Sequence, residues 1–113
     1  MQVAPLESYA DIVKNVIREH ASHKPSVGDI QVETIFDDAL GHYELMYAGW
    51  TGKHRVHGPV IHVDVRDGKV WVQYDGTEGG VALEFVEAGI PRDHIVFAFY
   101  PPSRRADTDF ATG

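Results

Sequence analysis

The feature that most constrains the fold is the pair Asp67-Gly68, which separates two strand-like runs, residues 55–66 and 69–74. Such a pair favours a two-residue type I′ turn, because both central residues of that turn need positive φ. The turn sets the register of a β-hairpin, which pairs Arg66 with Lys69, Val65 with Val70, Asp64 with Trp71, Val63 with Val72, His62 with Gln73, and Ile61 with Tyr74.

This register sorts the side chains onto two faces. The apolar face holds Ile61, Val63, Val65, Val70, Val72 and Tyr74. The opposite face holds His62, Asp64, Trp71 and Gln73. A slip of one residue would mix the two sets, so the hydrophobic pattern supports this pairing. Within the first run, Gly58-Pro59 removes a backbone donor and predicts a bulge or an edge segment.

A helix and a second hairpin precede this hairpin. Residues 6–20 have helical spacing, with Pro5 at a first-turn position and Glu7 and Asp11 near the positive end of the helix dipole. Residues 30–38 and 42–50 are rich in β-branched and aromatic residues and predict two paired strands. The expected pairs are Phe36 with Tyr43, Thr34 with Leu45, and Val32 with Tyr47. We expect the helix to pack on their apolar face.

The C-terminal third completes the expected fold. Residues 81–91 predict a short helix that ends at Gly89, and residues 94–100 predict a strand buried on both faces or central in the sheet. Residues 104–113 are expected to form an extended tail. The whole chain, 1–113, is predicted to be a single α+β domain, a two-layer α-β-β-β-β-α-β arrangement with a mainly antiparallel sheet and helices on one face.

Composition limits the function classes. The chain has no cysteine, so disulfides, thiolate metal sites and cysteine nucleophiles are excluded. Its formal net charge of −7 disfavours independent DNA binding, which draws on phosphate neutralisation. The one adjacent basic pair, Arg104-Arg105, is the candidate for nucleic-acid contact. An acidic first helix and the lack of a long apolar run indicate a cytoplasmic protein and no membrane partner.

The loop "YDGTEGGV", residues 74–81, could hold a metal or a phosphate or could start a helix. It lacks the ligand series of a calcium loop and the Lys-Ser/Thr of a P-loop. We expect Asp75 or Thr77 to cap the following helix and Glu78 to complete a capping box. The nearby Asp64 and "DGK" match a nuclease pattern weakly, since Asp67 and Gly68 are used in the turn.

Two functional interpretations remain for the polar face of the hairpin. His62 and Asp64 share a strand face, but sequence alone brings no further ligand to them, so we expect no metal site and no cofactor. Trp71 and Gln73 lie on the same face, and Trp50 and Met46 are expected there too. Large exposed aromatic side chains mark protein interfaces. We therefore predict an interaction face of His62, Asp64, Trp71, Gln73 and Trp50. The alternative is a core tryptophan covered by the tail or by the Gly-Pro segment.

The chain resembles the XisI-like family, named after the excision controlling factor of the fdxN element. The resemblance runs from about residue 6 to residue 111. It rests on "GDIQVETIFD", "HYELMYAGW", "GKHRVHGPVIHVDVRDGKVWVQYDGTE", "VEAGIPRDHIVFAFYPPSRR" and "TDFA". The resemblance implies an α-β(4)-α-β fold and a role beside XisH-like proteins, which look nuclease-like, in excising a DNA element. It implies no catalytic residues.

We therefore expect a non-enzymatic accessory protein that binds an XisH-like partner, touches DNA only indirectly, and can form a homodimer. If Trp71 is central to the contact, Trp71→Ala weakens binding by more than about 1 kcal/mol. One alternative is direct DNA contact through Arg104 and Arg105. Another is a metal-dependent enzyme that uses His62 and Asp64.

Overall fold

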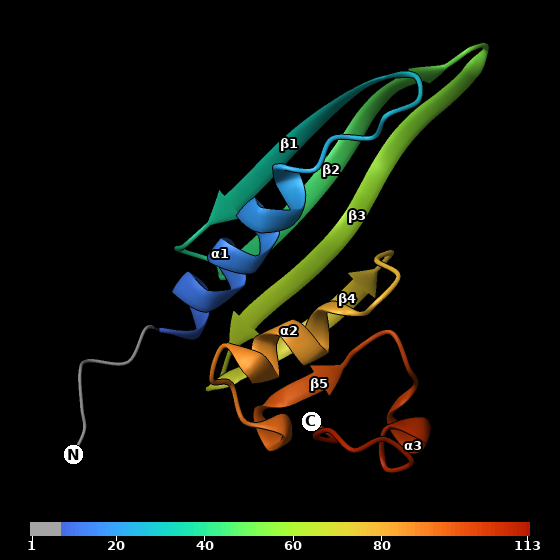
Figure 1. Ribbon diagram of the computed structural model, residues 1–113. Helices are drawn as coiled ribbons and strands as arrows, with labels where there is room; N and C mark the ends of the chain where they lie inside the picture. Colours follow the sequence, from blue (N-terminus) through green and yellow to red (C-terminus); the bar gives the residue numbers. More distant parts are fainter. Residues whose placement is uncertain (1–7) are drawn as a thin grey trace.

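A computed structural model describes residues 8–113, and its elements follow the predicted order (Figure 1). They are α1 (Tyr9–Ala21), β1 (Asp29–Asp37), β2 (His42–Thr51), β3 (His54–Arg66), β4 (Lys69–Asp75), α2 (Val81–Glu87), the 3-10 helix η1 (Arg92–His94), β5 (Ile95–Phe97) and α3 (Pro102–Arg105). The strands form one sheet in the order β1-β2-β3-β4-β5. The α+β class is therefore confirmed. The predicted roles of Pro5 and Glu7 at the start of the helix lie outside the described residues.

The helices α1 and α2 pack on the same face of the sheet, and the core lies between the two layers (Figure 1). A hydrogen bond of 2.7 Å joins His20 Nε2 of α1 to Glu84 Oε2 of α2. The fully buried members of the core are Val13, Ile17, Tyr43, Leu45, Ile61, Val63, Val70, Val72, Val81, Phe85, Ile90 and Ile95. Neither α1 nor α2 covers the other face of the sheet, here called the open face. Within residues 8–113, no helix combines the length and the apolar character that crossing a membrane requires.

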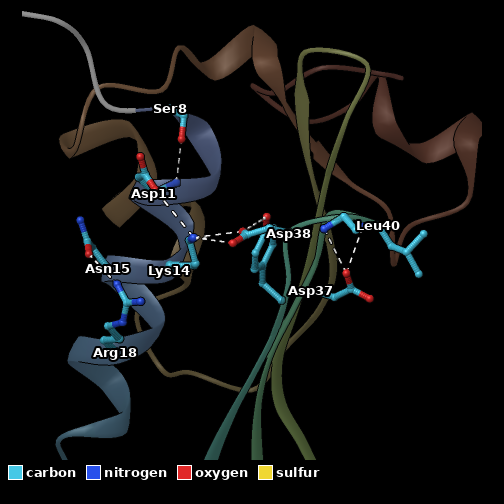
Figure 2. Close-up of polar contacts among 10 residues, drawn as sticks. Ser8, Asp11, Lys14, Asn15, Arg18, Asp37, Asp38 and Leu40 are labelled. Atoms are coloured by element: carbon cyan, nitrogen blue, oxygen red, sulfur yellow. Dashed lines mark hydrogen bonds and ion pairs between the residues drawn. The ribbon is translucent and has the colours of Figure 1, made fainter.

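Polar contacts fix α1 at its start and on the β1–β2 turn (Figure 2). Ser8 is the N-cap residue, and its Oγ accepts a hydrogen bond of 3.1 Å from the backbone N–H of Asp11. From the next turn of the helix, Lys14 Nζ donates to both carboxylate oxygens of Asp38, at 3.0 and 3.1 Å. The helix is thereby held against the turn that joins the first two strands.

The first hairpin has the predicted register, with Phe36 opposite Tyr43 and Leu45 opposite Thr34. Strands β1 and β2 approach very closely at Gly49. A Cβ atom at that position would lie 1.9 Å from the carbonyl oxygen of Asp29, so only glycine fits. The glycine of the "GW" sequence is thus required by strand pairing.

The second hairpin begins as predicted and then departs from the expected register. Asp67 and Gly68 have φ of 54° and 73°, as a type I′ turn requires, and the pairs run correctly to Val63 opposite Val72. A bulge at Gln73 then shifts the pairing, so His62 lies opposite Tyr74 instead of Gln73. The prediction that Tyr74 faces the core is therefore wrong, and its side chain is 49% exposed.

A second bulge lies in β3, next to the Gly58-Pro59 pair that predicted it. Met46 pairs with Pro59 while Leu45 pairs with Ile61, so Val60 is the extra residue. Proline cannot donate a hydrogen bond to the neighbouring strand, which explains the interruption at this point. The Val60 bulge directly precedes Ile61 in β3, and the Gln73 bulge of β4 lies opposite the step between His62 and Val63.

The glycine-rich loop starts a helix, as expected, and Asp75 supplies a side-chain acceptor at its start, but the predicted capping box does not form. Asp75 Oδ2 accepts a hydrogen bond of 2.8 Å from the backbone N–H of Val81, and Asp75 Oδ1 accepts from Thr77. Gly80 is the N-cap residue, so Glu78 precedes the helix and cannot complete a capping box. At the other end, Gly89 adopts φ of 115° and closes the helix as predicted.

The C-terminal region differs from expectation. Strand β5 is buried on both faces, as one prediction required, but it pairs in parallel with β4 at the edge of the sheet. Residues 104–113 are not an extended tail, because they include the end of α3 and then return to the sheet. Ala111 forms a bridge with Val96, and the Phe110 ring lies 4.6 Å from that of Phe97. Ring packing and edge pairing hold this segment in place.

Candidate functional site

The centre of the open face carries a cluster of polar side chains around Asp64. Asp64 is 4% exposed, and it is the one charged residue that is buried within residues 8–113. His42 lies directly opposite it on β2, and His62 lies two positions before it on β3. Gln73, the bulged residue of β4, approaches from the other side. We call these four residues the Asp64 cluster.

Each oxygen of the Asp64 carboxylate has defined partners. Oδ1 lies 2.6 Å from His42 Nδ1 and 3.0 Å from His62 Nε2. Oδ2 accepts a hydrogen bond of 3.1 Å from Gln73 Nε2, and Arg66 Nη1 lies 3.7 Å from it. Because an ionised carboxylate only accepts hydrogen bonds, it favours imidazole forms that carry a proton on the facing nitrogen.

These contacts shift the pKa values within the cluster. Burial raises the pKa of Asp64, but the hydrogen bonds and charges of His42 and His62 outweigh burial and bring the pKa below its ordinary value. The hydrogen bond from His42 to Asp64, together with the negative charge of that carboxylate, raises the pKa of His42. Asp64 is therefore a buried anion whose charge is compensated by its neighbours.

The two bulges create this arrangement. Without the extra residue Val60, the regular pairing that begins at the β2–β3 turn would place His42 opposite Val63 instead of Asp64. The bulge at Gln73 similarly turns a side chain toward Asp64. Bulges often redirect side chains in this way at functional sites.

The structure brings together three of the predicted interaction residues, His62, Asp64 and Gln73. It adds His42, which the sequence analysis did not consider. The signal was present, since counting back along β2 from the β2–β3 turn and adding one residue for the Gly-Pro bulge places His42 beside Asp64.

Trp71 lies next to the cluster, opposite Asp64, but it is half-buried. The guanidinium carbon of Arg66 lies 4.5 Å from its ring centroid and that of Arg105 5.9 Å. Trp71 Nε1 also faces the carbonyl oxygen of Arg66 at 3.4 Å. The alternative interpretation of this residue, a tryptophan partly covered by the C-terminal segment, therefore agrees with its surroundings.

Trp50 belongs to a different part of the open face. It lies near the far end of the β2–β3 hairpin, which projects beyond the helices (Figure 1), and it is 49% exposed. The guanidinium carbon of Arg55, opposite it on β3, lies 5.4 Å from the Trp50 ring centroid. A shallow cleft beside this pair is lined by Asp29, Gln31, Ala48, Gly49, Trp50 and Arg55.

The two C-terminal arginines have different surroundings. Arg105 donates hydrogen bonds to the carbonyl oxygens of Tyr100 and Ala98, at 3.0 and 3.4 Å, and so holds the chain around α3. Arg104 is more exposed, with Asp107 3.9 Å away. Two of the three Arg105 guanidinium nitrogens are therefore already bonded to carbonyl oxygens of the segment before α3.

Within residues 8–113, the group of side chains that could hold a metal ion is His42, His62 and Asp64. Their potential ligand atoms all lie within 4.8 Å of one another. His54 and His57 lie further along β3, opposite Thr51 and Ala48, and do not join them.

The protein is thus a small two-layer α+β domain. Helices cover one face of its single sheet, and the other face carries a buried carboxylate whose negative charge is compensated by its neighbours. The chain belongs to the XisI family, because the family model described as XisI protein matches residues 3–112. No curated protein sequence matches it significantly.

Two solved structures are closely similar, both from Anabaena variabilis. One is the crystal structure of a XisI-like protein, with a TM-score of 0.87 and 37% sequence identity. The other is that of the fdxN element excision controlling factor XisI, with a TM-score of 0.80 and 28% identity. Each match covers 93% of this chain and 96% of the solved chain.

Proposed function

We propose that this protein is a non-enzymatic regulatory partner of an XisH-like, nuclease-type protein and acts with it in DNA excision or site-specific recombination. The observation that carries the proposal is membership of the XisI family over residues 3–112. A structural relative with 28% identity is described as an excision controlling factor, which supports a regulatory role.

Charge supports a protein partner over direct contact with DNA. The chain carries a formal net charge of −7, so it repels phosphate and attracts a basic surface. A nuclease-type protein has such a surface where it binds DNA. An acidic partner can cover that surface or be steered toward it.

We assign the contact to the open face, with Trp50 as its anchor. Tryptophan and arginine are enriched among the residues that dominate binding energy, and the stacked Trp50–Arg55 pair is exposed at the projecting end of the sheet. Trp71 has a supporting role in this arrangement, because Arg66 and the C-terminal segment already cover much of it.

The test is co-expression with an XisH-like protein from the same genome, followed by size-exclusion chromatography with light scattering. A stable hetero-complex is expected. In a titration with the purified partner, Trp50→Ala should weaken binding by more than about 1 kcal/mol, or about fivefold in Kd. Leu83→Ala, which shortens a half-exposed side chain on α2, is the matched control and should bind normally.

Three results would contradict the proposal. Separate elution of the two proteins would exclude a stable complex, and a self-association lost in Trp50→Ala would assign the open face to a homodimer. A mobility shift of DNA by the isolated chain at low salt, lost in Arg104→Ala, would favour direct nucleic-acid contact.

A further inference from the structure

The Asp64 cluster contains more histidine side chains than a simple ion pair requires. Two imidazoles from adjacent strands approach the same carboxylate oxygen, while the other oxygen is occupied by Gln73. One histidine would compensate one buried carboxylate. Two imidazole nitrogens and a carboxylate oxygen are the ligand types preferred by zinc and similar divalent ions.

The spacing of these atoms suits a small ion. With metal–ligand bonds of about 2.0–2.1 Å, the ligands of a tetrahedral site lie about 3.3 Å apart. The atoms here are 2.6 and 3.0 Å from Asp64 Oδ1, and all three lie within 4.8 Å of one another. Small rotations of His42 and His62 therefore suffice to accommodate an ion in place of the two protons they share with Asp64.

The surroundings orient the ligands and leave a path for entry. Gln73 fixes the Asp64 carboxylate through Oδ2, the kind of outer contact that orients metal ligands. The side chains of His42 and His62 are 48% and 32% exposed, so solvent reaches the site and can fill a fourth position.

The charges around the site are mixed but favour a cation. Asp37 lies opposite His42 on β1, and its charge contributes to the negative potential there. Glu44 lies opposite His62 on β2. The positive charge of Arg66, whose Nη1 lies 3.7 Å from Asp64 Oδ2, disfavours a cation at the site. The same guanidinium also packs on the Trp71 ring.

From this geometry we propose that His42, His62 and Asp64 bind one divalent transition-metal ion of the zinc class, with water at the remaining position. The site requires no partner protein, so its test is independent of the proposed function.

The experiment is calorimetric titration of the chelator-treated protein with ZnCl₂, with MgCl₂ as the control ion. One Zn²⁺ per chain is expected, whereas Mg²⁺, which prefers oxygen ligands, should give no signal. His42→Gln and Asp64→Asn should each weaken Zn²⁺ binding by at least about tenfold. His57→Gln is the matched control, since His57 is an exposed histidine further along β3.

Two further measurements separate metal binding from folding. Circular dichroism of each variant checks that it is folded, and His42→Gln, a change at a half-exposed side chain, keeps the test informative if Asp64→Asn unfolds. Visible absorption of the Co²⁺-loaded protein should show the bands of a four-coordinate ion. Absence of Zn²⁺ binding, or binding that survives His42→Gln at full affinity, would overturn the proposal.

Discussion

Replacing Tyr43 by phenylalanine tests how a buried phenol contributes to stability. The Tyr43 side chain is 2% exposed in the core, and its Oη donates a hydrogen bond of 2.8 Å to Asp38 Oδ1. Asp38 also accepts a hydrogen bond from Lys14 Nζ, so the bond between Tyr43 and Asp38 lies at the contact between α1 and the β1–β2 turn. At neutral pH, Tyr43→Phe should cost about 1 kcal/mol, because water can replace the hydroxyl at the exposed Asp38 oxygen.

At alkaline pH the same substitution should instead become stabilising, because Tyr43→Phe removes a phenol whose ionisation destabilises the folded wild type. Burial, then the hydrogen bond to Asp38 and nearby negative charges, raise the pKa of Tyr43 from 10.0 to about 12. A group whose pKa is raised by folding stabilises the fold fully below its unfolded pKa, and this stabilisation is lost as pH rises through the folded pKa. A shift of two units corresponds to about 2–3 kcal/mol lost between about pH 10 and 12.

The measurement is urea denaturation, followed by far-ultraviolet circular dichroism, at a series of pH values from neutral to alkaline. Other groups also titrate, so the informative quantity is the difference in unfolding free energy between wild type and Tyr43→Phe. That difference should shrink above pH 10 and then reverse in sign. Tyr74→Phe controls for the loss of one phenol at an exposed position. If the wild-type and Tyr43→Phe curves stay parallel up to pH 12, burial does not keep this phenol protonated.

Two other substitutions test local features of the fold, each by urea denaturation. Asp75→Ala should lower the unfolding free energy by about 1–2 kcal/mol, since it removes the acceptor for the Val81 N–H at the start of α2, whereas Glu78→Ala should have little effect. Gly49→Ala should cost at least about 1–3 kcal/mol, because its Cβ would meet the Asp29 carbonyl at 1.9 Å and force β1 and β2 apart. A Gly49→Ala protein of unchanged stability would show that the two strands are not so closely paired.

Much of the fold could be predicted because local signals agreed with one another. Asp67-Gly68 determined a turn, and the alternating pattern around it determined the faces as far as the pair Val63 and Val72. The Gly58-Pro59 pair likewise located a bulge, since proline lacks the N–H that strand pairing uses. These features depend on residues close together in the chain.

The site and the C-terminal segment depend on contacts that are distant in sequence. His42 meets Asp64 only after the β2–β3 register has been shifted by one residue, so their contact depends on the pairing of two strands along most of their length. Similarly, no local sequence pattern predicts that Phe110 packs on Phe97 or that Ala111 forms a bridge with Val96. Tertiary contacts therefore determine both the Asp64 cluster and the path of the C-terminal segment.

The extra residue Val60 also affects how sequences of this kind should be compared. In β3, odd-numbered residues such as Arg55 and His57 share the open face before the bulge, whereas even-numbered residues such as His62 and Asp64 share it afterwards. An alignment with a relative that lacks this extra residue, made without a gap at Val60, would therefore match core residues of one β3 strand with open-face residues of the other. That single gap decides whether Asp64, which follows the bulge, is matched with its counterpart in such a relative.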